Sequence, residues 1–266
     1  MRAILPLKEI LWPAVFIAGA AWVIWNFPKF IISFGWASDA LKVLHGPAGA
    51  ADWLALALIV AGFVMGIRTV RATAMEEPIQ SWFDRISLFL ARVTMLLIVM
   101  LVSVMMYEVV LRYVFERPTL WANELSLWTA GFIFLFAGLY AMQQRSHIRI
   151  YLLYDAMPRW MQKASDVIST ALIWVFTVTM IWGGYGEARD KLLRWETFGT
   201  AFDPPIPATL KPMVLIAILL VSVQALANLI VDWNKAPIHH APVDESEIEE
   251  LVHEMEDRAQ DADQRG

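Results

Sequence analysis

The sequence predicts an all-α integral membrane protein. It has a four-helix core over about residues 86–233, an amphipathic arm helix within that core, and two further membrane helices at the N-terminus. Of the 266 residues, 58% are hydrophobic and only 18% are charged. The mean hydropathy is +0.52, far above the usual value for soluble domains. The apolar residues also gather in windows long enough to cross a hydrocarbon core of about 30 Å.

Four of these windows form the predicted core. Residues 125–144, 167–186 and 212–231 contain no charged side chain, and a helix of that length crosses the bilayer. Residues 93–111 form the fourth window, where we expect Arg92 to snorkel toward the interface. Glu108 and Arg112 follow at a spacing of four residues, which favours an ion pair on one helix face over an ion relay.

Two more windows precede the core, at residues 10–27 and 48–67. The first resembles a signal peptide, but its apolar stretch exceeds the usual length of about 7 to 15 residues and lacks a clear cleavage site. We therefore expect an uncleaved helix. In the second, Gly62 and Gly66 either allow another helix to approach closely or stand there by chance. Residues 30–44, between the two windows, are too polar to cross and are expected at the interface.

The remaining segments are amphipathic or acidic. Apolar residues recur at helical spacing over residues 149–163, which predicts an arm helix on the membrane surface that Pro158 kinks or divides. Residues 244–260 contain one possible helix start, with Ser246 and Glu249 at capping-box spacing. The expected division is an N-terminal extension over residues 1–78, a membrane domain over 79–233 and an acidic cytoplasmic tail over 234–266. The tail is expected to stay solvated.

The orientation in the membrane follows from the positive charges. More Lys and Arg residues flank one side of the spans, which predicts that both termini lie in the cytoplasm.

Charge and residue types exclude several classes of function. No basic stripe with interleaved aromatics suggests nucleic-acid binding. The chain has no cysteine, and all of its histidines lie outside the windows, where they cannot clasp a haem within a bundle. We expect no catalytic site, no metal site and no cofactor.

Three separated motifs surround the window at residues 125–144. Arg112-Tyr113-Val114-Phe115 closes the preceding span, Trp121 and Glu124 open the window, and His147-Ile148-Arg149 follows it. This pattern resembles the small, Q-type (DctQ-like) membrane subunit of tripartite ATP-independent periplasmic (TRAP) transporters over about residues 80–233. The matching residues are Arg112, Trp121, Glu124, His147 and Arg149.

The sequence departs from the pattern of that family at two places. The family often has an aspartate shortly after the His-Ile step, where this chain has Tyr151. The two N-terminal helices also exceed its four-helix pattern.

The resemblance implies a non-enzymatic small permease subunit in a bacterial inner membrane. It implies two protein partners besides membrane lipid: a large TRAP membrane subunit that moves like an elevator and carries the substrate and sodium sites, and a periplasmic substrate-binding protein that commonly delivers an organic acid. This chain would then be a membrane scaffold, or stator, and its five matching residues would be architectural or contact another subunit. In the loop expected at residues 187–211, Arg189, Arg194 and Trp195 are candidates for docking the periplasmic protein.

Two other classes of function compete with this interpretation. One is a membrane anchor for a redox enzyme, against which the absence of histidines from the spans argues. The other is a self-sufficient small transporter, which the scarcity of intramembrane ionisable residues disfavours.

Overall fold

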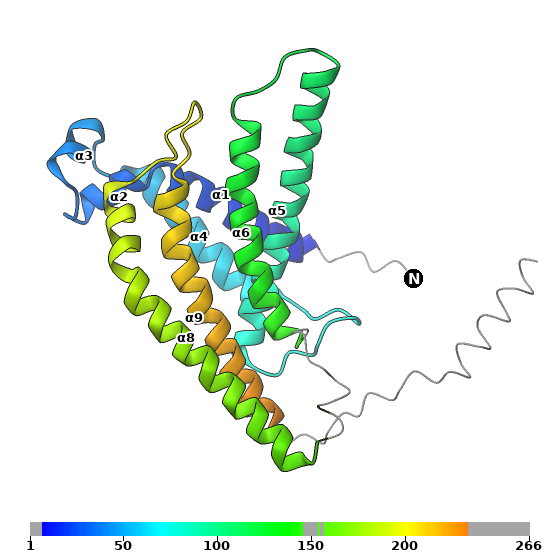
Figure 1. Ribbon diagram of the computed structural model, residues 1–266. Helices are drawn as coiled ribbons and strands as arrows, with labels where there is room; N and C mark the ends of the chain where they lie inside the picture. The colour runs from blue at the N-terminus through cyan, green and yellow to red at the C-terminus, as the bar shows by residue number, and fades with distance from the viewer. Residues whose placement is uncertain (1–6, 146–153, 155–156, 234–266) are drawn as a thin grey trace, which may run out of the picture.

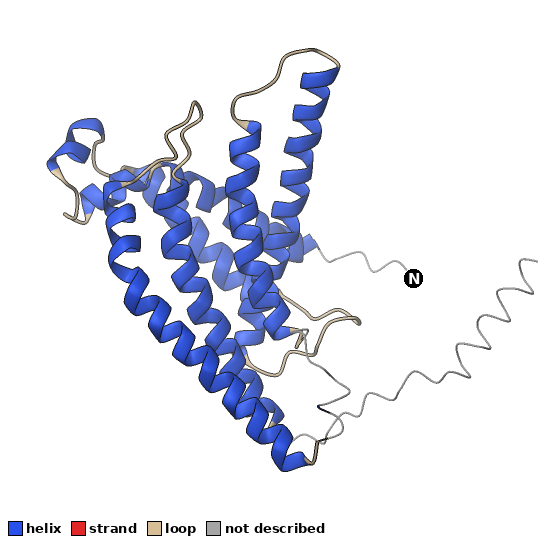
Figure 2. Cartoon of the chain, viewed as in Figure 1, coloured by secondary structure: helices blue, strands red, loops and turns tan. Residues whose placement is uncertain are grey.

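The structure is a computed structural model that describes residues 7–145, 154 and 157–233. Within these residues the chain is helical and forms no strand, as Figure 2 shows. The all-α prediction is therefore confirmed.

Four long helices form the core, and α9 packs between α6 and α8 although it follows both in the chain (Figure 1). Helix α5 packs against α6, α6 against α9, and α9 against α8. Their bounds are Trp82–Tyr113 for α5, Ala122–Gln143 for α6, Arg159–Arg194 for α8 and Ile206–Asp232 for α9. Each predicted core window lies within one of these helices, apart from the last residue of the window at 125–144.

Helix α5 begins well before the predicted window because its first turns are polar but capped. The Ser81 hydroxyl accepts a hydrogen bond from the backbone N–H of Asp84 at 3.2 Å, and the Asp84 carboxylate accepts one from the Ser81 N–H at 2.7 Å. This capping box satisfies backbone donors that would otherwise be unpaired at the helix start. A search for uncharged windows could not include a segment that contains Asp84, Arg85 and Arg92.

The N-terminal extension contains four helices, of which two are long. These are α1 (Leu7–Trp25), α2 (Phe27–Ser33), α3 (Asp39–Leu44) and α4 (Ala50–Thr69). Helix α1 lies along α4, and both contact α5. Among the residues that the structure describes, five helices (α4, α5, α6, α8 and α9) are long and apolar enough to cross a membrane, and α1 with α2, bent by 67° at their junction, makes a sixth if the pair counts as one span.

Two glycines of α4 allow close packing, Gly62 against α1 and Gly66 against α5. A Cβ at Gly62 would lie 3.0 Å from the Phe16 backbone nitrogen on α1, and one at Gly66 would clash with the Phe89 ring on α5. Phe89 is buried and meets the rings of Phe16 and Phe63 edge-on, at centroid distances of 5.5 and 5.6 Å. Both glycines therefore stand at close helix contacts, as the first of the two alternatives expected.

Two segments are predicted to lie at the membrane interface, residues 30–44 and 149–163. Residues 30–44 include the end of α2 and all of α3, which are short helices separated by a turn. The last part of the predicted arm, Arg159 to Lys163, is the first turn of α8 rather than a separate surface helix, and Pro158 is its N-cap. Most of residues 149–156, and the acidic tail from residue 234 onward, lie outside the described residues.

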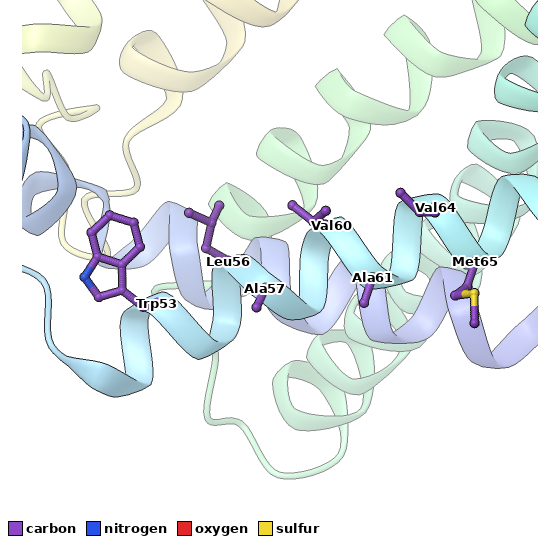
Figure 3. A pocket seen from close by; sticks show the side chains of 7 residues that line it. All are labelled: Trp53, Leu56, Ala57, Val60, Ala61, Val64 and Met65. Carbon is purple, nitrogen blue, oxygen red and sulfur yellow. The ribbon is translucent and has the colours of Figure 1, made fainter.

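Helix α4 also presents an apolar hollow of about 550 Å³. Figure 3 shows its lining along α4, from Trp53 at one end to Met65 at the other, without a charged side chain. A surface of this kind suits lipid acyl chains, since it offers a polar ligand no group that would fix its orientation.

Candidate functional site

The turn between α5 and α6 is held by Glu108. Its Oε1 receives hydrogen bonds from Arg112 at 2.6 and 3.1 Å, and its Oε2 receives one from the Thr119 N–H at 3.0 Å and another from the Thr119 hydroxyl. The predicted pair of Glu108 and Arg112 is therefore present. Because Glu108 is buried and its oxygens are occupied by groups of the turn, its role here is structural.

Trp121 and Glu124 open α6 as predicted, and both have partners. Trp121 is the N-cap of α6 and its ring lies 6.1 Å from the ring of Tyr107. Glu124 lies in the first turn, where the helix macrodipole favours an acid. Its carboxylate accepts a hydrogen bond from the Thr200 hydroxyl at 2.5 Å. This bond ties the start of α6 to the loop between α8 and α9.

The loop between α8 and α9 is shorter than predicted. Helix α8 continues to Arg194 and α9 begins at Ile206, so the loop covers residues 195–205 and Arg189 lies on α8. Arg189 and Arg194 are exposed. Trp195 is half-buried and stacks on Phe27 at 5.1 Å. Its ring is therefore engaged with the N-terminal extension, whereas the two arginines face outward.

Most of the candidate residues share one end of the bundle, which we call the turn end because it carries the α5–α6 turn and the α8–α9 loop (Figure 1). The hydrogen bond between Glu124 and Thr200 joins these two connections. His147 and Arg149 lie outside the described residues, so the structure places neither of them.

The opposite end of the bundle contains a buried ion cluster that the sequence did not reveal. We call it the Arg92 end. The Arg92 guanidinium binds both carboxylate oxygens of Glu76, at 2.8 and 2.7 Å, and Glu9 lies 3.5 Å away. The Tyr140 hydroxyl donates to Glu76 at 3.1 Å. The expectation that Arg92 snorkels was wrong, because Glu76 from the segment before α5 gives it a fixed partner.

Glu76 is held in its charged form. Burial alone would raise the pKa of its carboxyl, but hydrogen bonds from Arg92 and from the Thr73 N–H outweigh burial and keep the pKa below its usual value. The cluster thereby joins α1, the segment before α5, α5 itself and α6.

A second polar network near this end crosses the core helices. The Gln224 amide of α9 donates to Asp84 at 2.8 Å and accepts from the Ser87 hydroxyl of α5 at 2.8 Å. Asn228 donates to the Met142 carbonyl of α6 at 2.8 Å. The sequence contains one signal that could have predicted this network. Gln224 and Asn228 are polar residues four positions apart in a window that is mostly apolar, and polar side chains within a membrane need hydrogen-bond partners.

These geometries connect helices and do not assemble reactive groups. Within the part of the chain that the structure describes, no three His, Asp or Glu side chains gather as a metal site. The buried carboxylates instead bind charged or polar partners: Glu76 pairs with Arg92 on α5, and Glu108 pairs with Arg112 on its own helix and with Thr119 in the turn that follows. The candidate site is thus a set of contacts that fix the helices, with Arg189 and Arg194 exposed at the turn end.

A curated protein of known family is similar to the chain. The chain is 25% identical over 152 residues to the C4-dicarboxylate TRAP transporter small permease protein DctQ of Vibrio cholerae serotype O1 (strain ATCC 39315 / El Tor Inaba N16961). This match covers 55% of the chain and 64% of the relative, which is less than two thirds of the relative's length. No solved structure matches the chain.

A family model also matches the chain. Residues 101–235, which are 135 of the 266, match the family described as tripartite ATP-independent periplasmic transporters, DctQ component. The match begins inside α5 and runs through α6, α8 and α9, so it includes the Arg112, Trp121 and Glu124 motifs and leaves out the N-terminal extension. The family is a transporter component and not an enzyme. The chain is therefore a multi-pass membrane protein that belongs to the DctQ, or small permease, family of TRAP transporters.

Proposed function

We propose that the chain is the stator of a TRAP transporter. In this proposal it anchors a large membrane subunit that moves like an elevator and carries out cation-coupled uptake of an organic acid. A periplasmic binding protein delivers that acid. The substrate class is suggested by the Vibrio cholerae relative, whose name contains C4-dicarboxylate.

The observation that carries the proposal is that the core helices are tied together at both ends. At the turn end, Glu108 closes the α5–α6 turn and Glu124 reaches the next loop. At the Arg92 end, Gln224 bridges α9 to α5, and Arg145 pairs with Asp232 at 2.7 Å. Rigid elements with occupied polar groups suit a static support better than a moving carrier.

We further propose an arrangement in a bacterial inner membrane with both termini in the cytoplasm. The excess of Lys and Arg near the Arg92 end supports this orientation. The turn end would then face the periplasm. Residues 1–78 would form an accessory unit, residues 79–233 the stator domain and residues 234–266 a cytoplasmic tail.

In this orientation the exposed arginines of the turn end are available to the periplasmic binding protein. Arg189 and Arg194 lie in the last turns of α8, beside the α8–α9 loop. Charged groups at the rim of an interface mainly set the rate and salt dependence of association. We therefore propose that these two residues contribute to docking, with Trp195 holding the loop in place through Phe27.

Uptake by cells tests this proposal. Cells that lack the chain should not accumulate radiolabelled succinate, a C4-dicarboxylate, and expression of the wild-type chain should restore uptake. The double variant Arg189→Glu/Arg194→Glu should restore at most about a tenth of the rate, since like charges across an interface oppose association.

The matched control is Arg189→Lys/Arg194→Lys, which keeps both charges and should restore most of the uptake. Equal uptake by the charge-reversed and wild-type chains would contradict the docking role alone. Uptake of organic acids that does not depend on the chain at all would contradict the proposed function.

A further inference from the structure

A basic cavity lies between the end of α4, the segment that follows it and the start of α5. Its volume is about 540 Å³, and its lining includes Arg68, Arg71 and Arg85 but no acidic side chain. Arg68 and Arg71 are exposed and Arg85 is half-buried. In the described chain, no hydrogen bond or ion pair joins these three guanidinium groups to another residue.

The acidic residues of the same region are turned to other partners. Glu76 binds Arg92, and Glu77 lies 3.6 Å from Arg145. Asp84 caps the start of its own helix and receives the Gln224 amide. Three positive charges therefore line one cavity without a neutralising carboxylate, which makes it a site for an anionic ligand.

The position of the cavity identifies the source of the anion. Helices α4 and α5 both cross the membrane, and the cavity lies where one ends and the other begins. Trp82 and Phe83, in the first turn of α5, are exposed, as is typical of aromatic residues at the membrane surface. Apolar side chains from Val70, Pro78 and Ile79 also line it. The lining therefore combines guanidinium groups with apolar side chains, which is the combination that a phospholipid requires.

We propose that this cavity binds the headgroup of an anionic phospholipid, with Arg68, Arg71 and Arg85 contacting its phosphate. Basic pockets at the ends of membrane helices are suited to such headgroups. A bound lipid would join α4, and thus the N-terminal extension, to α5. The site lies before residue 101, where the family match begins, and it does not depend on the proposed transport function.

The test measures lipid binding to the full chain in detergent. Thermal unfolding is followed by tryptophan fluorescence while dioleoylphosphatidylglycerol, dioleoylphosphatidylcholine or inorganic phosphate is added. Native mass spectrometry then counts the lipids that stay bound. We expect the anionic lipid to raise Tm at concentrations where phosphatidylcholine and phosphate do not, and this effect to weaken as salt is added.

The variant Arg68→Gln/Arg71→Gln/Arg85→Gln should bind the anionic lipid roughly 100-fold more weakly, since each basic residue near an anionic surface contributes about fivefold. The control Arg117→Gln/Arg189→Gln/Arg194→Gln removes the same charge at the turn end and should bind like wild type. The single variants Arg68→Gln and Arg71→Gln, at exposed positions, should each weaken binding about fivefold without loss of folding.

Unchanged binding by the triple and single variants would overturn the proposal. An equal effect of phosphatidylcholine would also overturn it, because the site would then not select for charge. Equal stabilisation by inorganic phosphate would show that the arginines bind free phosphate and would rule out the lipid headgroup as the occupant.

Discussion

Buried charges in this protein connect elements that are distant in sequence. Asp52, at the start of α4, receives hydrogen bonds from Trp22 at 3.0 Å and from Lys29 at 3.5 Å. Glu76 likewise receives hydrogen bonds from Arg92 and from the Tyr140 hydroxyl. A charge within an apolar bundle is costly unless it is paired and hydrogen-bonded. Each of these residues therefore restricts the positions that its partner helices can take.

Glu76 provides a test of this role. The variant Glu76→Gln leaves Arg92 with Glu9, 3.5 Å away, as its remaining carboxylate partner. The loss of unfolding free energy should therefore stay below the roughly 3 to 5 kcal/mol of a buried pair that is broken completely. We expect a fall in Tm of several degrees, measured by fluorescence in detergent. The neighbouring variant Glu77→Gln is the control. Its side chain is 42% exposed and 3.6 Å from Arg145, so its Tm should stay close to that of wild type.

The same variant has a predicted pH dependence. Because the pKa of Glu76 is lowered in the folded protein, its carboxylate stabilises the fold above its unfolded pKa, and this contribution is lost as pH falls through the folded pKa. The difference in stability between wild type and Glu76→Gln should be constant well above pH 4.3, about the ordinary glutamate pKa, and shrink below it. A difference that grows on acidification would contradict this assignment.

At the scale of the helix, the sequence predicts the spans well and their ends poorly. Uncharged windows located α6, α8 and α9 because lipid excludes charged side chains from long stretches. The same criterion shortened α5, whose start contains Asp84 and Arg92, because pairing between helices is not visible in one helix. It also divided Arg159–Lys163 from α8, since a polar first turn outside the bilayer looks like a separate element.

The candidate site was predictable to a similar degree. The partners of Arg112 and the position of Glu124 in a first turn follow from spacing along one helix. Contacts such as Glu124 with Thr200, or Arg92 with Glu76, join residues from different elements. These contacts arise only when the helices pack together, so no local pattern in the sequence predicts them.

Close packing between α1 and α4 can be tested at Gly62. In the variant Gly62→Ala, the new Cβ would meet the backbone of Phe16 and Trp12 at 3.0 to 3.3 Å, and backbone atoms can yield little. We expect a loss of about 1 to 3 kcal/mol, as is usual for overpacking. Thermal unfolding in detergent measures it.

Gly138→Ala is the matched control, because a Cβ at Gly138 on α6 would meet no atom within 4 Å apart from its chain neighbours and the nearby backbone of its own helix. Alanine is a better helix former than glycine by about 1 kcal/mol, so this variant should be as stable as wild type or more so. Equal stability of Gly62→Ala and Gly138→Ala would show that α1 and α4 are not packed as described.

At the scale of the whole molecule, the four helices of the family domain and the N-terminal extension behave as one connected body. Phe89 of α5 contacts rings from α1 and α4, and the Arg92 cluster adds Glu9 of α1 to the same junction. In the proposed stator, an extension fixed in this way would enlarge the membrane surface that the chain offers to a partner. These contacts between the extension and the family domain are part of the basis on which the stator role is proposed.

Co-purification tests this account most directly. The tagged full chain is solubilised from native membranes in mild detergent, captured on an affinity resin, and the proteins that accompany it are identified by mass spectrometry. The account predicts recovery of a larger, many-helix permease in a fixed ratio to the chain. Recovery of a redox enzyme with a haem absorption band, or of the chain alone under conditions that preserve other membrane complexes, would contradict it.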